Sequence, residues 1–242
     1  MIKSAMVMAA GLGTRMRPLT NDRPKPLVRV ANKALIDHSL DKLREASIHD
    51  VVVNVHYLPE MIRSHLATNA SDLNVSISDE SELLLETGGG LVKAMPLLTA
   101  DPFYCINSDN IWTDVNGSAL LNLATSWDDE KMDALLLVVP HATAFNHNGA
   151  GDFFLEDDGR LRRRGDSTAA PFIYTGIQLI SHRLLADPPS GAFSTNIFWN
   201  RAIALGRLYG AVHEGEWFDI GAPSSIAPTE ARIMANSDVN NA

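Results

Sequence analysis

Short apolar segments alternate with helix-patterned segments along the first 140 residues of the chain. The strand-like segments fall at residues 4–10, 50–55, 74–78, 102–109 and 133–139, and the helix-like segments at residues 35–48, 59–67, 89–98 and 117–127. Several strand-like segments are apolar without alternation, as in strands that are buried on both faces. This order predicts an α/β fold, with a Rossmann-like, mostly parallel mixed sheet flanked by helices.

The pattern changes after residue 140. Here the sequence predicts a hairpin at 151–165, a long strand at 172–180, a helix at 193–206 and two short strands at 207–221. We interpret the 242 residues as one domain, because the length suits a single core and no linker or repeat divides it. Within it, residues 1–140 form a core and residues 141–235 a smaller α+β cap. The end of the chain, residues 235–242, is predicted to fray.

Basic residues are concentrated at the start of an otherwise acidic chain. Residues 1–30 contain six Lys and Arg residues and one acidic residue, a local charge of +5, whereas the whole chain carries −9. The acidic total argues against a general nucleic-acid binder or a binder of anionic membranes. A local cationic patch is better suited to a small anion, so we expect neither nucleic acid nor membrane as a partner.

The sequence also indicates the compartment. It has no apolar run of the roughly 18 to 20 residues that a membrane span requires. Its first apolar stretch, about six residues, is shorter than the roughly 7 to 15 of a signal peptide. The single cysteine, Cys105, excludes an internal disulfide and agrees with a reducing compartment. These features predict a cytoplasmic protein.

The loop after the first predicted strand reads AAGLGTRMRPLTNDRPKPL, residues 9–27. Gly11 and Gly13 would allow backbone N–H groups to approach an anion. Arg15 would offer a planar fork for phosphate oxygens, and Lys25 an exposed charge on a long stem. The loop fits neither a P-loop nor the three-glycine dinucleotide fingerprint. A glycine turn with solvated arginines is the alternative, but the whole pattern favours an anion site.

Two acidic residues stand in otherwise apolar segments. Asp109 ends the strand-like segment 102–109, and Asp219 lies within EWFDIGAP, residues 216–223. A carboxylate at the carboxyl end of a strand, in a crevice facing phosphates, is where α/β enzymes usually hold Mg²⁺. Either acid alone could equally cap a turn.

Three consecutive glycines, residues 88–90, come directly before a predicted helix. The start of a helix needs one flexible residue at most, so the local structure does not account for three of them. They would let a flat base lie against the backbone, with amide N–H groups reading the edge of the base.

The segment GLGTRMRPLTNDRPKPL, residues 11–27, resembles the G-x-G-T-R-[LM]-x-P-L-T-x-x-x-P-K-P-L signature of sugar-1-phosphate nucleotidyltransferases. The resemblance implies a GT-A-like fold and a transferase that forms a nucleotide-sugar and pyrophosphate from a nucleoside triphosphate and a sugar-1-phosphate. It implies that Arg15 and Lys25 are catalytic: Arg15 would hold the β- and γ-phosphates, and Lys25 the α-phosphate and the sugar phosphate. It also implies that Asp109 and Asp219, the latter in a W-x-D-x-G element, bind magnesium.

The same resemblance assigns the other site residues. Those assigned to nucleotide binding are Ala10, Gly11, Gly13, Thr14, Gly88 and Gly89, with Glu82 and Glu86 less firmly supported. Those assigned to sugar binding are Asn107, Asp152, Thr175 and Gly176. A sugar phosphate is already a nucleophile, so positioning and charge neutralisation would carry the reaction without a general base.

One family element is missing. Most members carry an E-K-P element before the strand at 172–180, and this chain has LRRRGDSTAAPF, residues 161–172, in its place. Recognition of the sugar is therefore expected to differ. We interpret Arg162–Arg164 as a solvated strand edge, with a role in holding an acidic sugar as the alternative.

Longer stretches, including LLETGGGLVKAMPLL and GRLYGAVHEGEWFDIGAP, resemble one subgroup, the N-acetylmuramate α-1-phosphate uridylyltransferases of peptidoglycan recycling. That resemblance implies UTP and N-acetylmuramate α-1-phosphate as substrates. The segment STNIFWNRA departs from the subgroup, so a mannose- or glucose-1-phosphate nucleotidyltransferase is an alternative. A non-catalytic subunit that senses nucleotide-sugars is the alternative of another class. We expect a monomer or a homodimer.

Overall fold

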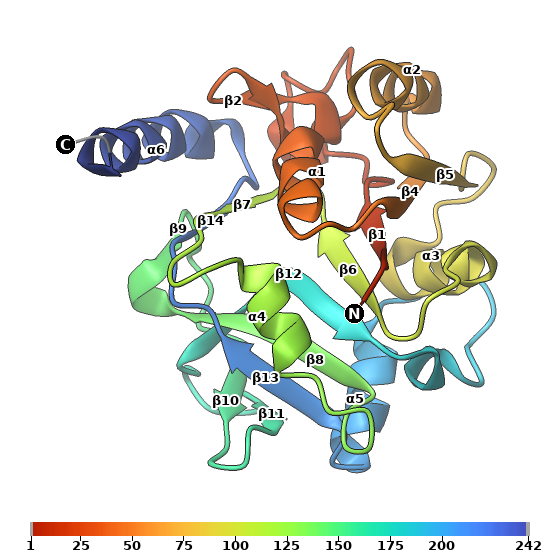
Figure 1. The fold of residues 1–242 in the computed structure, drawn as a ribbon, viewed down its shortest axis with the longest axis vertical. Helices are drawn as coiled ribbons and strands as arrows, with labels where there is room; N and C mark the ends of the chain where they lie inside the picture. The colour runs from red at the N-terminus through yellow and green to blue at the C-terminus, as the bar shows by residue number, and fades with distance from the viewer. Residues whose placement is uncertain (1, 241–242) are drawn as a thin grey trace.

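A mixed sheet forms the centre of the molecule (Figure 1). The computed structural model describes the backbone of residues 2–240 and the side chains of residues 2–236. The strands of this sheet are β1 (Ser4–Met8), β4 (Asp50–Val55), β5 (Asn74–Asp79), β6 (Phe103–Asn107), β8 (Ala134–Pro140), β10 (Phe153–Leu155), β11 (Leu161–Arg163), β12 (Phe172–Ile180) and β13 (Leu208–Val212).

The strand order places the first and second parts of the chain side by side. Across the sheet it runs β11-β10-β12-β6-β1-β4-β5, with β8 along the other edge of β12 and β13 beside β8. β6, β1, β4 and β5 run parallel, whereas β12 is antiparallel to both β6 and β8. The predicted mixed sheet flanked by helices is confirmed.

Helices cover both faces of this sheet. α1 (Leu35–Glu45), α2 (Pro59–Asn69) and α4 (Ala119–Thr125) pack on one face, and α3 (Glu86–Ala94) and α5 (Asn196–Ala204) on the other. Along β1, Ala5 and Val7 join the hydrophobic cluster of the first face and Met6 joins that of the second. The apolar run of this strand is therefore buried on both sides. No helix within residues 2–240 combines the length and apolar character that crossing a membrane requires.

Very short strands form two further pairings. A small sheet contains β7 (Asn110–Trp112), β14 (Trp217–Asp219) and β9 (Ala144–Phe145), and a hairpin contains β2 (Arg29–Val30) and β3 (Lys33–Ala34). The two short strands predicted at 207–221 correspond to β13 and β14. The strands β2, β3, β7 and β9 escaped prediction because two or three residues carry no periodicity.

The last helix, α6 (Ile226–Asn240), lies beside β2 and outside the layers on the central sheet (Figure 1). Arg232 pairs with Glu216, and Asn236 Nδ2 donates to the same carboxylate at 2.7 Å. The segment predicted to fray from residue 235 is helical as far as Asn240. Residues 241–242 lie outside the described residues.

The division at residue 140 falls inside a shared sheet. β12, from the second part of the chain, pairs with β6 and β8 of the first part, and β13 pairs with β8. Ile173, Ile177 and Leu179 of β12 pack in the same hydrophobic cluster as α1 and α2. The regions described as core and cap are thus joined by backbone hydrogen bonds and by a shared hydrophobic cluster.

Candidate active site

The predicted anion loop opens onto a cavity at one edge of the central sheet. β1, β4 and β6 run parallel, so their carboxyl ends meet at this edge, where open α/β sheets usually bind ligands. The cavity, named the first cavity below, has a volume of about 240 Å³. Its walls include Ala10, Gly11, Lys25, Asn54, Thr87 and Asp109.

A buried chain of hydrogen bonds holds these walls together. Asn54 Oδ1 accepts from the backbone N–H of Ala9 at 2.7 Å, and its Nδ2 donates to Glu80 Oε1 at 2.7 Å. Glu80 is fully buried, and its Oε2 accepts from the backbone N–H of Leu85 at 3.0 Å. Such a network fixes three wall segments relative to one another. Sequence reasoning missed Asn54 and Glu80, although Asn54 is a polar residue near the end of the apolar strand β4.

The opening loop folds back on itself through two short turns, at Thr14–Met16 and Lys25–Leu27. Met16 is fully buried and anchors the loop in a cluster with Phe218. Gly13 has a left-handed φ of 61°, and a Cβ there would lie 2.9 Å from the Cβ of Lys25. Glycine at this position therefore lets the first turn lie against the stem of Lys25. Gly13 and Thr14 shape the loop but are not among the residues that line the first cavity.

Lys25 points into the site. Its Nζ donates to Asp109 Oδ2 at 2.6 Å, and only 9% of the residue is exposed. The expectation of an exposed lysine is wrong, because the preceding turn folds over its stem. A lysine held in this way is a compact, fixed positive charge in the wall of the cavity.

Asp219 lies beside Asp109, although the two are far apart in the sequence. β7 and β14 pair antiparallel with Asp219 opposite Asn110, the residue that follows Asp109. Burial raises the pKa of Asp219, and the charge of Asp109 raises it further, whereas Lys25 and Arg15 oppose the shift. The small sheet thus brings together the two acids that the sequence assigned to magnesium.

Arg15 approaches Asp219 from the exposed side of the loop. A Cβ on Gly221 would lie 3.3 Å from Asp219 Oδ1 and 3.4 Å from Arg15 Nη1, so both groups border Gly221. Arg15 itself is exposed, which leaves its guanidinium accessible to a ligand. Two carboxylates and two cations are therefore grouped here, and of these four residues Lys25 and Asp109 line the first cavity.

The donor set at Asp109 and Asp219 fits magnesium. Mg²⁺ prefers oxygen ligands and usually takes one or two carboxylates together with water and phosphate oxygens. Within the described part of the chain, no group of three or more His, Cys, Asp or Glu forms a metal-binding cluster. Burial and then the like charge of Asp109 raise the pKa of Asp219, and a bound cation would relieve the repulsion between the two carboxylates.

The glycines at 88–90 lie inside α3 and not in a loop before it, because the helix begins at Glu86. The backbone N–H groups of Gly88 and Gly89 donate to the carbonyl of Phe193 at 2.8 and 3.1 Å. A Cβ on Gly88 would lie 2.5 Å from the Phe193 ring, and one on Gly89 would lie 2.8 Å from the carbonyl oxygen of Gly191. The expectation that these amides read a base is contradicted, since they already have a partner. The glycines allow a second chain segment to pack on α3.

A second cavity, of about 170 Å³, adjoins the first. The two share Met8, Thr87 and Asn107 as lining residues, so Asn107 lies at their junction. Trp199 forms one wall, and its Nε1 donates to Gln178 Oε1 at 2.9 Å. A ligand in one cavity could therefore meet a ligand in the other beside Asn107.

The other predicted sugar residues support the walls from behind. Thr175 is fully buried, and its hydroxyl donates to the carbonyl of Leu137 at 2.8 Å. Gly176 has a φ of 81°, and a Cβ there would lie 2.8 Å from Asn107 Nδ2. The carboxylate of Asp152 accepts from the backbone N–H of Tyr174 at 2.9 Å. None of the three is among the lining residues of either cavity.

Of the two acids assigned less firmly to the nucleotide, Glu86 lines the first cavity and Glu82 does not. The arginines at 162–164 also differ from one another. Arg162 is exposed and pairs with Glu156 at 2.9 Å, as expected for a solvated strand edge. Arg163 is half-buried, with its guanidinium over the ring of Trp199, and Arg164 is half-buried and donates from Nε to the carbonyl of Gly151 at 3.0 Å. The expectation is therefore wrong for Arg163 and Arg164.

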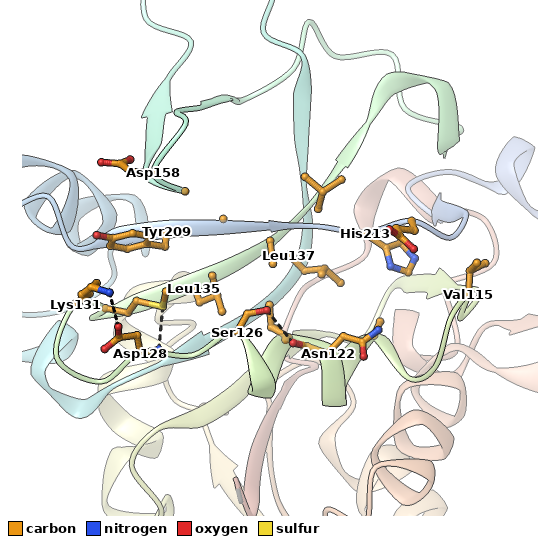
Figure 2. Close-up of a pocket in the computed structure, with 18 residues that line it drawn as sticks. Val115, Asn122, Ser126, Asp128, Lys131, Leu135, Leu137, Asp158, Tyr209 and His213 are labelled. Carbon is orange, nitrogen blue, oxygen red and sulfur yellow. Dashed lines mark hydrogen bonds and ion pairs between the residues drawn. The ribbon is translucent and has the colours of Figure 1, made fainter.

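A larger cavity, of about 570 Å³, lies between α4, β8 and β13 (Figure 2). Asp128, Asp158 and Glu214 line it together with one lysine, Lys131, whose Nζ is 2.8 Å from Asp128 Oδ2. Figure 2 shows Tyr209 on the β13 side of this space. Its negative balance does not suit a polyphosphate. None of the predicted site residues lines it.

Comparison with known proteins identifies the family of this chain. Residues 4–147 match the family model described as nucleotidyl transferase. The N-acetylmuramate alpha-1-phosphate uridylyltransferase of Caulobacter vibrioides is 45% identical over 96% of this chain and 97% of its own length. The enzyme of the same name from Neisseria meningitidis is 34% identical over 94% of this chain and 96% of its own length.

Solved structures share the fold. The inositol-1-phosphate CTP transferase from T. maritima superposes with a TM-score of 0.79 over 97% of this chain and 95% of its own, at 14% sequence identity. The family match covers more than half of the chain, and the two relatives align with nearly all of it. The chain therefore belongs to the nucleotidyl transferase family, and the sugar-1-phosphate nucleotidyltransferase predicted from its opening loop is confirmed.

Proposed function

We propose that the protein transfers the uridylyl group of UTP to N-acetylmuramate α-1-phosphate, forming UDP-N-acetylmuramate and releasing pyrophosphate. The observation that carries this proposal is the partly buried Lys25–Asp109 pair, which lies in a cavity that adjoins a second one. The choice of substrates is supported by the name of the Caulobacter relative, which is 45% identical over 96% of this chain. We place the reaction in the cytoplasmic recycling of cell-wall sugars.

The two cavities suggest where each substrate would lie. The nucleotide would occupy the first cavity, where Ala10 and Gly11 contribute backbone to the wall and Asn54 and Glu80 fix its shape. The sugar would occupy the second cavity, against Trp199. The reacting phosphates would then meet near Asn107, within reach of the charged groups.

In the reaction, an oxygen of the sugar phosphate would attack the α-phosphorus of UTP. The bond from that phosphorus to the bridging oxygen of pyrophosphate would break. Both reactants are anions, so orientation and charge neutralisation are the main requirements. Lys25 would hold the α-phosphate and the incoming sugar phosphate, and Arg15 the leaving pyrophosphate. No side chain needs to accept a proton, because the attacking phosphate is already ionised.

Asp109 and Asp219 would hold Mg²⁺, which supplies positive charge to the phosphate oxygens when it is bound. Asp109→Asn keeps the side-chain shape and removes the ligand charge. We expect it to raise the Mg²⁺ concentration for half-maximal turnover by at least about tenfold. Asp22→Asn is a matched control, because the side chain of Asp22 is 77% exposed in the opening loop. A metal titration of Asp109→Asn that coincides with that of the control would move the metal to another site.

The first test is pyrophosphate release by the full chain with Mg²⁺. UTP, dTTP, GTP, CTP and ATP would each be combined with the α-1-phosphates of N-acetylmuramate, N-acetylglucosamine, glucose and mannose. Fast turnover confined to UTP and N-acetylmuramate α-1-phosphate is the expected result. Preference for another pair would keep the reaction class and overturn the substrate proposal. A folded protein that binds nucleotide without turnover would favour a sensing subunit.

A further inference from the structure

Arg163, at the end of β11, is a half-buried cation held next to the second cavity. Its Nη2 donates to Asn196 Oδ1 at 2.8 Å, and its Nε donates to Asn200 Oδ1 at 3.2 Å. The centre of its guanidinium lies 5.0 Å from the centroid of the Phe153 ring and 5.3 Å from that of Trp199. Two amides and two aromatic faces thus fix the guanidinium in one orientation.

This cation has no carboxylate of its own. Within the described residues no ion pair involves Arg163, whereas the neighbouring Arg162 pairs with Glu156. Burial lowers the pKa of Arg163, and the charge of Asp152 only partly opposes that shift. The carboxylate of Asp152 is in turn bonded to a backbone N–H. The amides and rings around Arg163 are neutral, so its positive charge is not balanced by an ion pair, and an anionic ligand would supply the missing opposite charge.

Asn196 connects Arg163 to the second cavity. It is the first residue of α5 and lines the cavity. Arginine can only donate hydrogen bonds, so Asn196 must present Oδ1 to Arg163 and keep Nδ2 free for another partner. In the part of the chain with described side chains, that Nδ2 has no hydrogen-bond partner. Asn196 is exposed at the edge of the second cavity, and its bond to Arg163 leaves an N–H donor free there.

The walls of the second cavity are otherwise uncharged at neutral pH. Its lining consists of neutral side chains, including Thr87, Asn107, Gln178 and Trp199. Burial raises the pKa of its one cysteine, Cys105, to about 12, so the thiol stays protonated. Any preference of this cavity for a charged ligand must therefore arise from charged side chains that contact the lining residues without lining the cavity themselves.

We propose that Arg163 is a positioning residue that, through Asn196, makes the second cavity prefer sugar phosphates that carry a carboxylate over neutral ones. The inference rests on the proposed function, in which the sugar occupies this cavity. N-acetylmuramate differs from N-acetylglucosamine by a lactyl ether at O3, which adds one carboxylate. That carboxylate accepts from Asn196 Nδ2 and lies within the positive field of Arg163.

Equilibrium binding tests this inference separately from turnover. The full chain would be titrated by calorimetry with N-acetylmuramate α-1-phosphate and with N-acetylglucosamine α-1-phosphate, which form a matched pair. Galacturonate and galactose α-1-phosphates form a second pair. The unchanged protein should bind the acidic member of each pair more tightly. Arg163→Met keeps the stem over Trp199 and should lower the acidic-to-neutral affinity ratio about tenfold, the usual worth of a hydrogen bond to a charged group.

Three further variants make the test specific. Arg163→Lys retains the charge and should recover most of the ratio. Asn196→Asp still accepts from Arg163 but places a negative charge in the wall, so it should lower the ratio further than Arg163→Met. Arg162→Met is the control, because it removes an exposed arginine of the same strand whose partner is Glu156. With UTP present, the losses should appear in the KM of the acidic sugar and not in kcat.

The outcomes test the inference about Arg163 separately from the proposed function. Equal binding of acidic and neutral sugar phosphates by the unchanged protein would overturn the inference, and so would an unchanged ratio in Arg163→Met. Equal weakening of both members of a pair would assign Arg163 a merely structural role. Preferential binding of the acidic member without any turnover would support the inference and overturn the proposed function. If Arg163→Met does not fold, the ratios of Arg163→Lys and Asn196→Asp decide the question.

Discussion

At the scale of single residues, the removal of Lys25 leaves its acidic partners behind. Its Nζ is 2.6 Å from Asp109 Oδ2, and Asp219 lies beside that carboxylate. Lys25→Met should lower kcat about 10²- to 10³-fold, because a fixed charge on the transferring phosphate is lost. It should also destabilise the fold by about 1–3 kcal/mol, because a half-buried carboxylate loses its partner.

Pyrophosphate release and urea unfolding of the same preparations would measure both effects of Lys25→Met. Lys33→Met is the matched control, because Lys33 is exposed and pairs with Asp41 outside the site. The control should change neither quantity by much, since exposed ion pairs contribute little. Near-normal kcat in a folded Lys25→Met variant would remove Lys25 from the catalytic assignment.

The ionised form of Asp219 lowers the stability of the folded protein. Burial and then the charge of Asp109 raise its pKa above the ordinary value of 3.8, so the folded state binds a proton more readily than the unfolded state. The penalty is therefore present above the folded pKa and disappears as the pH falls below 3.8. Without metal, Asp219→Asn should raise the unfolding temperature at neutral pH and abolish turnover, and the gain in stability should shrink toward acid pH.

Thermal unfolding with and without Mg²⁺ would measure the effect of Asp219 on stability. Added Mg²⁺ should stabilise the unchanged protein more than Asp219→Asn, because a ligand stabilises only the state that binds it. Asp22→Asn, in the exposed part of the loop, is the control for the loss of one negative charge. An Asp219→Asn variant that is less stable than the unchanged protein at neutral pH without metal would refute this account.

At the scale of elements, the glycines of α3 decide how closely a neighbouring segment can pack. A Cβ on Gly89 would lie 2.8 Å from the backbone oxygen of Gly191, which cannot move without the chain. Gly89→Ala should therefore displace the segment before α5 and destabilise the fold by about 1–3 kcal/mol. It should also raise the KM for the sugar phosphate, because Thr195 and Asn196 of the second cavity follow that segment.

Gly11→Ala offers the contrasting case. A Cβ on Gly11 meets no atom within 4 Å, yet Gly11 lines the first cavity. This variant should keep its unfolding midpoint in urea and lose affinity for the nucleoside triphosphate. If Gly89→Ala were as stable as Gly11→Ala, the close packing of α3 would not be the reason for its glycines.

Elements with a long periodic pattern could be predicted from the sequence, and the pairings that build the site could not. The apolar runs of β1, β4 and β8 indicate buried strands directly. β7 and β14 are three residues each, and the register that places Asp219 opposite Asn110 depends on tertiary contacts. Arg163 illustrates the same limit, because its burial depends on α5, which lies later in the chain.

At the scale of the whole molecule, the position of β12 in the sheet is the feature that the order of elements did not predict. An alternation of strands and helices suggests sequential parallel pairing. Here the antiparallel β12 lies between β6 and β8, so the second part of the chain completes the sheet begun by the first. The second cavity depends on this pairing of β6 with β12. Asn107, which ends β6, lines the cavity together with Tyr174 and Gln178 of β12.

This topology predicts that residues 1–140 do not fold alone. The fragment would contain β6 and β8 without β12, so both strands would lose a hydrogen-bonded neighbour and expose apolar side chains. We expect it to be unfolded or aggregated. The full chain should instead unfold in one transition, with calorimetric and van't Hoff enthalpies that agree.

A chain that ends at residue 225 is the control for that truncation. It lacks α6, which lies beside β2 and pairs with Glu216 but adds no strand to the central sheet. This shorter chain should keep the far-UV dichroism and the amide protection of the central strands, because the pairing around β12 is intact. A soluble 1–140 fragment with protected β6 amides would show that the core folds independently. In that case β12 would add to a preformed sheet, and binding of the sugar could be separated from binding of the nucleotide.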